Sequence, residues 1–135
     1  MYKNILIPVA FEEERDVAGA MEVAARLSGP DAHTTFLHVM EQLPVYAAEY
    51  MPADMLAGTR SRAKERLSDL ADKVPGGRMA VIDGPTGRSI TEWASDNSAD
   101  LIVIPSHRPV FSDILLGSTA AWVVRHAQCA VHVIR

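Results

Sequence analysis

Short apolar runs alternate with longer amphipathic segments along this chain of 135 residues. The runs at 5–9, 33–40, 79–82, 101–105 and 130–134 are rich in Ile, Leu, Val and Ala, which is typical of strands buried in a parallel sheet. Apolar residues recur at helical spacing within 17–27, 55–74, 89–97 and 118–126, and three glutamates at 12–14 suit a first helical turn. Gly-Pro or Pro-Gly pairs at 29–30, 75–76 and 84–85 are expected to stop or turn these elements.

The segment 41–54 fits neither pattern. It carries Pro44, Tyr46, Tyr50 and Pro52, and we expect an irregular surface excursion or a lid. The pairs Tyr46 with Tyr50 and Met55 with Leu56 could cover a ligand, or could simply fill the gap between the excursion and the sheet.

Strands that alternate with helices predict one α/β domain over residues 1–135, with a parallel sheet, right-handed crossovers and helices on both faces. Ligands of such open sheets bind outside the carboxyl ends of the strands, where the strand order reverses. The segments that follow residues 9, 40 and 105 are therefore the places to search for a site.

Composition narrows the class of protein. Hydrophobic residues make up 48% of the chain, charged residues 22%, and the net charge is −4. The chain has no basic cluster to bind nucleic acid and no apolar run of membrane-spanning length. A single cysteine, Cys129, cannot form an internal disulfide, which favours a reducing cytoplasm. We interpret Cys129 as a small buried apolar residue rather than a reactive thiol.

The strongest chemical signal lies between Ile104 and Ala120. A polar stretch with Ser106, His107 and Arg108 follows a strand, and Gly117-Ser118-Thr119 then opens a helix. Amide groups at residues 117–119 and the helix dipole together favour an anion such as phosphate.

Each of these residues has two interpretations. Ser118 could cap the helix or donate its hydroxyl to a phosphate, and Arg108 could grip a phosphate or remain a solvated surface arginine. His107 could donate to the same anion or be merely structural. No carboxylate is placed to make His107 a catalytic base, and the other histidines lack the spacing of a metal site. We therefore expect no enzyme and no protein-held metal.

Several segments resemble the universal stress protein family over the whole chain. They are NILIPV, FLHV, ADLIVI and SHRPVFSDILLGSTAAWVVRHAQCAVHVIR, and the last is most similar to the F/G-type bacterial members. The resemblance implies a Rossmann-like fold, similar to the adenine nucleotide alpha hydrolases, with strand order 3-2-1-4-5. It also implies a homodimer with a role in the stress response and, in one subgroup, ATP binding, with Mg²⁺ expected on the phosphates.

The resemblance also assigns residues to the ATP site. Pro8, Val9 and Ala10 would form the adenine-side wall, and Val39 would meet adenine through its backbone. The family signature Gly-x-x-Gly, then a spacer, then Gly-Ser or Gly-Thr is kept at Gly117-Ser118. Pro105 and Arg108 stand at the first two glycines.

Two further departures matter. Eight residues separate Arg108 from Gly117, one fewer than in the family, and Ala10 stands where nucleotide-binding members have Asp. These departures motivate a second interpretation, a dimeric interaction module in stress signalling that binds no nucleotide. In either case a free edge strand at 130–134 would invite aggregation, so we expect it to pair with its copy in a homodimer.

Overall fold

A computed structural model describes residues 1–11, 14–41, 45–106 and 116–135 of the chain. Its strands form one sheet of order β3-β2-β1-β4-β5, with all neighbours parallel. This confirms the predicted α/β fold and strand order. The strands are β1 (Tyr2–Pro8), β2 (Ser28–Met40), β3 (Gly77–Asp83), β4 (Leu101–Pro105) and β5 (Ala130–Ile134).

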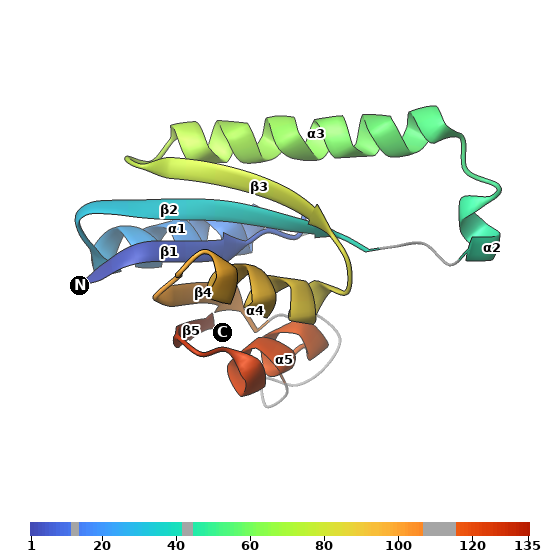
Figure 1. Cartoon of the computed structure of the whole chain (residues 1–135). Helices are drawn as coiled ribbons and strands as arrows, with labels where there is room; N and C mark the ends of the chain where they lie inside the picture. The colour runs from blue at the N-terminus through green and yellow to red at the C-terminus, as the bar shows by residue number, and fades with distance from the viewer. Residues whose placement is uncertain (12–13, 42–44, 107–115) are drawn as a thin grey trace.

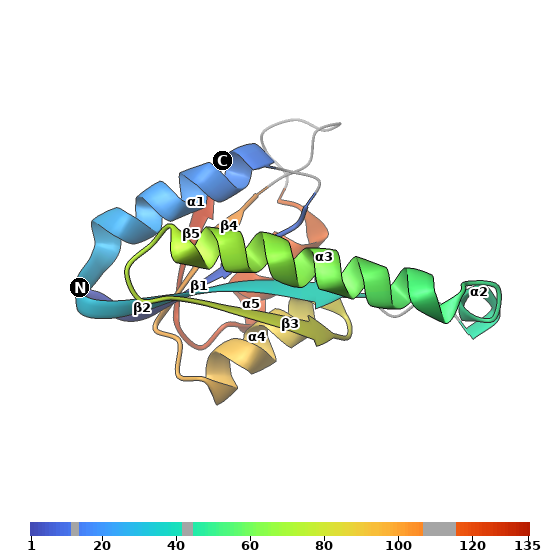
Figure 2. The same cartoon turned by 90° about the horizontal axis from the view of Figure 1, so that it is seen from above.

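Helices cover both faces of the sheet (Figures 1 and 2). On one face lie α1 (Glu14–Leu27) and α3 (Ala53–Asp72), and on the other lie α4 (Thr86–Asp96) and α5 (Ser118–His126). A four-residue helix, α2 (Val45–Ala48), precedes α3. No helix in these described ranges is both long and apolar enough to span a membrane.

Neighbouring residues of the central strands point into two different cores. On β1, Ile5 and Ile7 pack with α1 and α3, whereas Leu6 packs with α4 and α5. All three side chains are completely buried. Burial on both faces explains why β1 reads as an unbroken apolar run instead of an alternating one.

Strand boundaries differ from the sequence prediction mainly on β2. The predicted Gly29-Pro30 stop does end α1 at Leu27, but both residues already belong to β2. The β1–β2 register jumps there, from Tyr2 opposite Ser28 to Asn4 opposite His33. This irregularity accommodates Pro30, which has no amide hydrogen for the ladder.

Residues 45–56 extend past the carboxyl edge of the sheet (Figures 1 and 2). We predicted irregular structure as far as Asp54, but α2 and the start of α3 lie in this stretch. Leu56, at the start of the predicted amphipathic segment, is 38% exposed because α3 begins beyond the sheet that its later turns cover. The residues Ala63, Leu67, Leu70 and Ala71 on those later turns are buried as predicted.

Asp100 joins the amino ends of β1 and β4. Its two carboxylate oxygens accept hydrogen bonds from the backbone amides of Lys3 and Asn4, both at 2.9 Å. The Asp100 amide donates in turn to the Asn4 carbonyl at 2.9 Å. These bonds set the register between two strands that are 96 residues apart in the chain.

Cys129 lies half-buried just before β5 and packs against the core formed with α4 and α5. Burial raises the pKa of its thiol, the charge of Asp100 adds to this effect, and a backbone hydrogen bond partly opposes it. Both packing and pKa agree with an apolar role for Cys129.

We expect Asp100→Ala to lower the free energy of unfolding by about 1–2 kcal/mol, because two strand-end amides lose their acceptor. Chemical denaturation followed by circular dichroism measures this loss. Asp69→Ala, an exposed change on α3, should shift stability by less than about 0.5 kcal/mol. Equal stability of Asp100→Ala and wild type would contradict the role of this clamp.

We also expect the Cys129 thiol of the folded protein to react slowly with an aromatic disulfide reagent at pH 8. Its raised pKa leaves less thiolate at that pH than an ordinary cysteine has. The rate should increase as pH rises, and denaturant should remove the difference from a free cysteine. A native thiol that reacts as fast as the denatured one would disprove this prediction.

Candidate functional site

The larger of two candidate cavities in the described structure, called the larger cavity below, opens at the carboxyl ends of β1, β2 and β4 and has a volume of about 730 Å³. The strand order reverses between β1 and β4 at this edge, as the fold class predicts for a ligand site. Seven of the residues assigned from the sequence line it together: Pro8, Val9, Ala10, Val39, Gly117, Ser118 and Thr119.

The start of α5 forms one end of the cavity. Gly117 is the N-cap, so Ser118 is not the capping residue that one interpretation allowed. The Gly117 amide donates to the Ser106 carbonyl at 3.0 Å, and the Ser106 amide donates to the Ile134 carbonyl at 2.7 Å. The expectation that residue 117 offers a free amide is therefore wrong, and the amides of the first turn begin at Ser118.

The other residues assigned from the polar stretch have different outcomes. Pro105 ends β4 and lines the cavity. Ser106 does not line it, although its backbone holds α5 and β5 together. His107 and Arg108 lie outside the described residues, so their assignment stays a prediction.

The opposite end of the cavity is built where β1 and β2 end. The Val9 amide donates to the Leu37 carbonyl at 2.8 Å, which extends the pairing one residue beyond Pro8. His38 holds the next turn of the chain: its Nδ1 lies 2.8 Å from the Val9 carbonyl, and its ring packs on Phe11 with centroids 4.3 Å apart. Because a carbonyl only accepts, the hydrogen of His38 sits on Nδ1.

Glu41 and Thr86 form part of the rim beyond β2. The Thr86 hydroxyl donates to Glu41 Oε1 at 2.7 Å and joins the end of β2 to the start of α4. An ion pair of Arg60 with Asp83 ties α3 to the end of β3 nearby. Sequence reasoning missed Glu41, although it directly follows a strand whose carboxyl end was marked for search.

The long α3 helix contributes a further wall through Leu56 and Thr59, together with Met51 before it. Leu56 thus contacts the cavity as the sequence allowed. Met55, Tyr46 and Tyr50 do not line it and are 53%, 73% and 85% exposed.

Gly87 and Trp122 bring the starts of α4 and α5 to the same cavity. A Cβ atom on Gly87 would lie 2.7 Å from Trp122 Cγ, so the two helices contact closely only because residue 87 has no side chain. The Arg88 guanidinium lies 5.9 Å from the centre of the indole ring and covers this contact.

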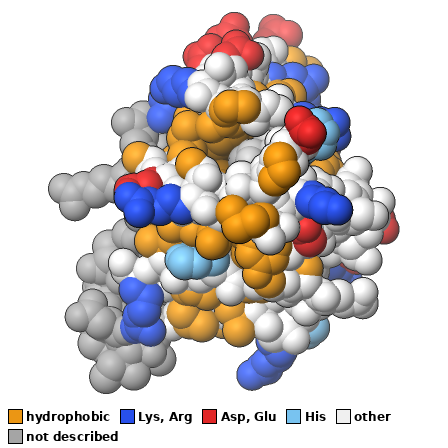
Figure 3. Space-filling view, turned by 90° about the vertical axis from the view of Figure 1, so that its left-hand side faces the viewer, with side chains coloured by type: hydrophobic (Ala, Val, Ile, Leu, Met, Phe, Trp, Pro, Cys, Tyr) orange, Lys and Arg blue, Asp and Glu red, His pale blue; other side chains and the backbone are white. Residues whose placement is uncertain are grey.

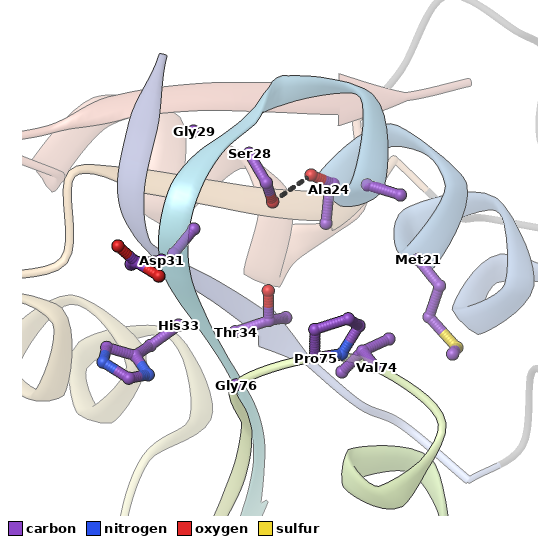
Figure 4. A pocket seen from close by; sticks show the side chains of 12 residues that line it. Met21, Ala24, Ser28, Gly29, Asp31, His33, Thr34, Val74, Pro75 and Gly76 are labelled. Atoms are coloured by element: carbon purple, nitrogen blue, oxygen red, sulfur yellow. Dashed lines mark hydrogen bonds between the residues drawn. The ribbon is translucent and has the colours of Figure 1, made fainter.

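A second cavity of about 520 Å³ lies at the amino ends of the strands, on the end of the molecule shown in Figure 3. Hydrophobic side chains gather on this end of the surface. In Figure 4, Met21 and Ala24 lie on one side of β2 while His33 and Asp31 point to the other side, and the Ser28 hydroxyl is bound to the Ala24 carbonyl at 2.6 Å. The polar groups do not converge on one point, so this cavity is the weaker candidate.

The described residues contain no cluster of three or more His, Cys, Asp or Glu side chains that could hold a metal ion. In the described lining of the larger cavity, the ionisable side chains are His38 and Glu41. The site offers an apolar floor, backbone amides at one end and a carboxylate at the other. Such an arrangement suits an elongated ligand with an anionic end and a hydrogen-bond donor.

Comparisons with known proteins point to one family. A family model described as the universal stress protein family matches residues 1–135. Universal stress protein A homolog 2 of Coxiella burnetii is 32% identical, with 99% of this chain and 95% of the relative covered. Universal stress protein G of Escherichia coli O157:H7 is 31% identical, with both chains fully covered.

Solved structures show the same fold. Universal stress protein UspA from Lactobacillus plantarum superposes with a TM-score of 0.79 at 25% identity and covers 99% of this chain and 98% of its own. An Arabidopsis thaliana family member with AMP bound has a TM-score of 0.66 at 18% identity, with 98% of this chain and 90% of its own covered. An Archaeoglobus fulgidus member in complex with dAMP has a TM-score of 0.65 at 19% identity, with 99% and 98% covered.

Proposed function

This chain belongs to the universal stress protein family, and we propose that it is a cytoplasmic regulatory protein of the stress response that binds ATP without turning it over efficiently. The observation that carries this proposal is the 730 Å³ cavity, which joins the ends of β1 and β2 to the start of α5. Its volume lies within the range of small-molecule sites. The AMP and dAMP complexes of two proteins of the same fold support an adenine nucleotide.

The phosphates would lie at the start of α5. The amides of Ser118 and Thr119 have no intrahelical acceptor in a first helical turn, and the helix dipole favours negative charge there. Arg108 would add a guanidinium, so that a side chain replaces the flexible glycine of the family signature. Mg²⁺, when present, would be held by the phosphates, because a small hydrated cation needs few protein ligands.

The base would lie between the ends of β1 and β2. Pro8, Val9 and Val39 offer an apolar surface for a flat ring, and the exposed Ala10 brings no hydrogen-bonding side chain. Affinity at the end of β1 therefore depends on apolar contact and on backbone groups.

The described side chains support binding rather than catalysis. The imidazole of His38 is held by the Val9 carbonyl, and the Glu41 carboxylate is held by Thr86. Neither forms a hydrogen bond with a hydroxyl that could act as nucleophile toward a phosphate at α5, so no base is matched to a nucleophile there.

We also propose that β5 pairs with its copy in a homodimer. β5 is an edge strand, and its Val131, Val133 and Ile134 are only partly buried. The Ile134 carbonyl accepts from Ser106 and so faces β4. The backbone groups of Val131 and Val133 therefore face outward and are available to a second copy.

A second candidate function is an interaction module without nucleotide. The observation that favours it is the exposed apolar group Val45, Tyr46, Tyr50 and Met55, with exposed fractions of 78%, 73%, 85% and 53%. Such a group beyond the edge of a domain is typical of a surface that meets a partner.

Purified protein should release adenine nucleotide when it is denatured, and ATP should bind the emptied protein with measurable heat. Chromatography of the supernatant and isothermal titration calorimetry check the two statements. If no nucleotide is released and millimolar ATP gives no heat, the nucleotide proposal is wrong and the interaction module is favoured.

Ser118→Glu should weaken ATP binding by about tenfold or more, because a carboxylate beside the first-turn amides repels phosphate. Ser118 is exposed, and a glutamate suits the first turn of a helix, so the fold should be unchanged. Ser118→Gln has similar size without charge and should weaken binding by less than about threefold. Equal affinities of the two variants would contradict phosphate binding at α5.

Val131→Pro should convert the homodimer to a folded monomer, because it removes an outward amide and leaves the bonds to β4 intact. Light scattering after size exclusion measures the mass, and circular dichroism checks the fold. His132→Ala, on the same strand, should remain a dimer. A wild-type monomer, or a Val131→Pro dimer, would disprove pairing through β5.

A further inference from the structure

Glu41 and the start of α5 lie at opposite ends of the larger cavity. Glu41 follows β2, whereas α5 lies beyond β4, and β1 stands between these two strands. Two interstrand spacings correspond to about 10 Å. A nucleotide whose phosphates rest at Ser118 would thus place its base, rather than its ribose, near the end of β2.

The Glu41 carboxylate is oriented by two features of α4. Thr86, the first residue of this helix, donates its hydroxyl to Oε1 at 2.7 Å. The amino end of α4 also favours a negative charge beside it. Within the described structure no other hydrogen bond reaches this carboxylate, so Oε2 is available to a ligand.

His38, the other ionisable group in the described lining, does not compete for this role. Its Nδ1 donates to the Val9 carbonyl and its ring packs on Phe11. The hydrogen bond between Thr86 and Glu41 does not involve His38. No lysine or arginine belongs to the described lining. The Glu41 carboxylate is therefore a hydrogen-bond acceptor at the end of β2, and no lysine or arginine of the described lining neutralises its charge.

We propose that Glu41, oriented by Thr86, accepts a hydrogen bond from the amino group at C6 of the bound purine and selects adenine against 6-oxopurines. This inference rests on the proposed nucleotide function. A 6-amino group donates to Oε2, whereas the 6-oxo group of hypoxanthine or guanine places an acceptor against the carboxylate. At C6 of such a base Oε2 and the oxygen are two acceptors with no hydrogen between them, and such a loss discriminates more strongly than a change of shape. The N1–H of a 6-oxopurine meets Oε2 only if the base shifts along the rim, and equal or tighter binding of inosine triphosphate would report that shift.

The test measures the affinities of ATP and inosine triphosphate, which differ only at the purine ring, by calorimetry on nucleotide-free protein. Wild type should prefer ATP by about tenfold, a modest ratio because Glu41 is exposed to solvent. Purine riboside triphosphate, which has no group at C6, should bind with intermediate affinity. The difference between ATP and purine riboside triphosphate then measures the attraction of the 6-amino group to Glu41. The difference between purine riboside triphosphate and inosine triphosphate measures the repulsion of the 6-oxo group.

Glu41→Gln should reduce the preference to less than about threefold, because an amide both donates and accepts and so serves either base. Thr86→Val keeps the shape of the side chain and removes the orienting hydroxyl, so the preference should fall to an intermediate ratio. Glu49→Gln removes an exposed carboxylate on the neighbouring segment, outside the cavity lining, and should keep the wild-type ratio.

Each outcome separates this inference from the proposed function. If wild type binds ATP and inosine triphosphate equally, or if Glu41→Gln keeps the full preference, the role of Glu41 is wrong while nucleotide binding stands. If wild type binds neither triphosphate, the proposed function fails and this inference fails with it. Unfolding midpoints that match wild type ensure that the variants report on recognition rather than on folding.

Discussion

Burial of the central strands on both faces is the constraint on which the rest of this structure depends. Ile5, Leu6 and Ile7 on β1 and Val103 on β4 have no exposed surface. They can be buried this completely only if helices cover each face, and right-handed crossovers then bring every strand end to the same edge. The crossover from β1 to β2 runs over one face through α1, and the crossover from β3 to β4 runs over the other face through α4. The cavity opens where the strand order reverses, between β1 and β4.

Hydrogen bonds outside the ladders of the β-sheet fix the positions of the strand ends. At the amino end Asp100 sets the register of β1 against β4, and at the carboxyl end Val9 and His38 hold the segment that turns away from β1. Ser106 joins β5 to the start of α5 through its backbone alone. These contacts use the backbone together with the side chains of Asp100 and His38, and none of them involves the side chain of Ala10, so the fold does not depend on the residue at position 10.

In the proposed nucleotide site, recognition does not depend on a side chain at position 10. Ala10 brings no polar group to the cavity, and the polar side chains of the described lining near the ends of β2 and β3 include His38, Glu41, Thr59 and Thr86. Glu41 and Thr86 come from segments far apart in the sequence and meet only because β2 and β3 are neighbours. A fold whose strand ends meet at one edge can carry a recognition group on one strand end or on the next.

The sequence by itself determined the order and type of the major elements, because the spacing of apolar residues along the chain shows which residues are buried. The family resemblance supplied the strand order. Seven of the predicted residues line one cavity: the resemblance supplied Pro8, Val9, Ala10 and Val39, whereas Gly117, Ser118 and Thr119 belong to a Gly-Ser helix start, which is a local feature. Only the tertiary structure decided the partners. The Gly117 amide is taken by Ser106, Glu41 meets Thr86, and Gly87 admits Trp122. Such contacts join residues whose separation along the chain says nothing of their distance in space, so no local pattern encodes them.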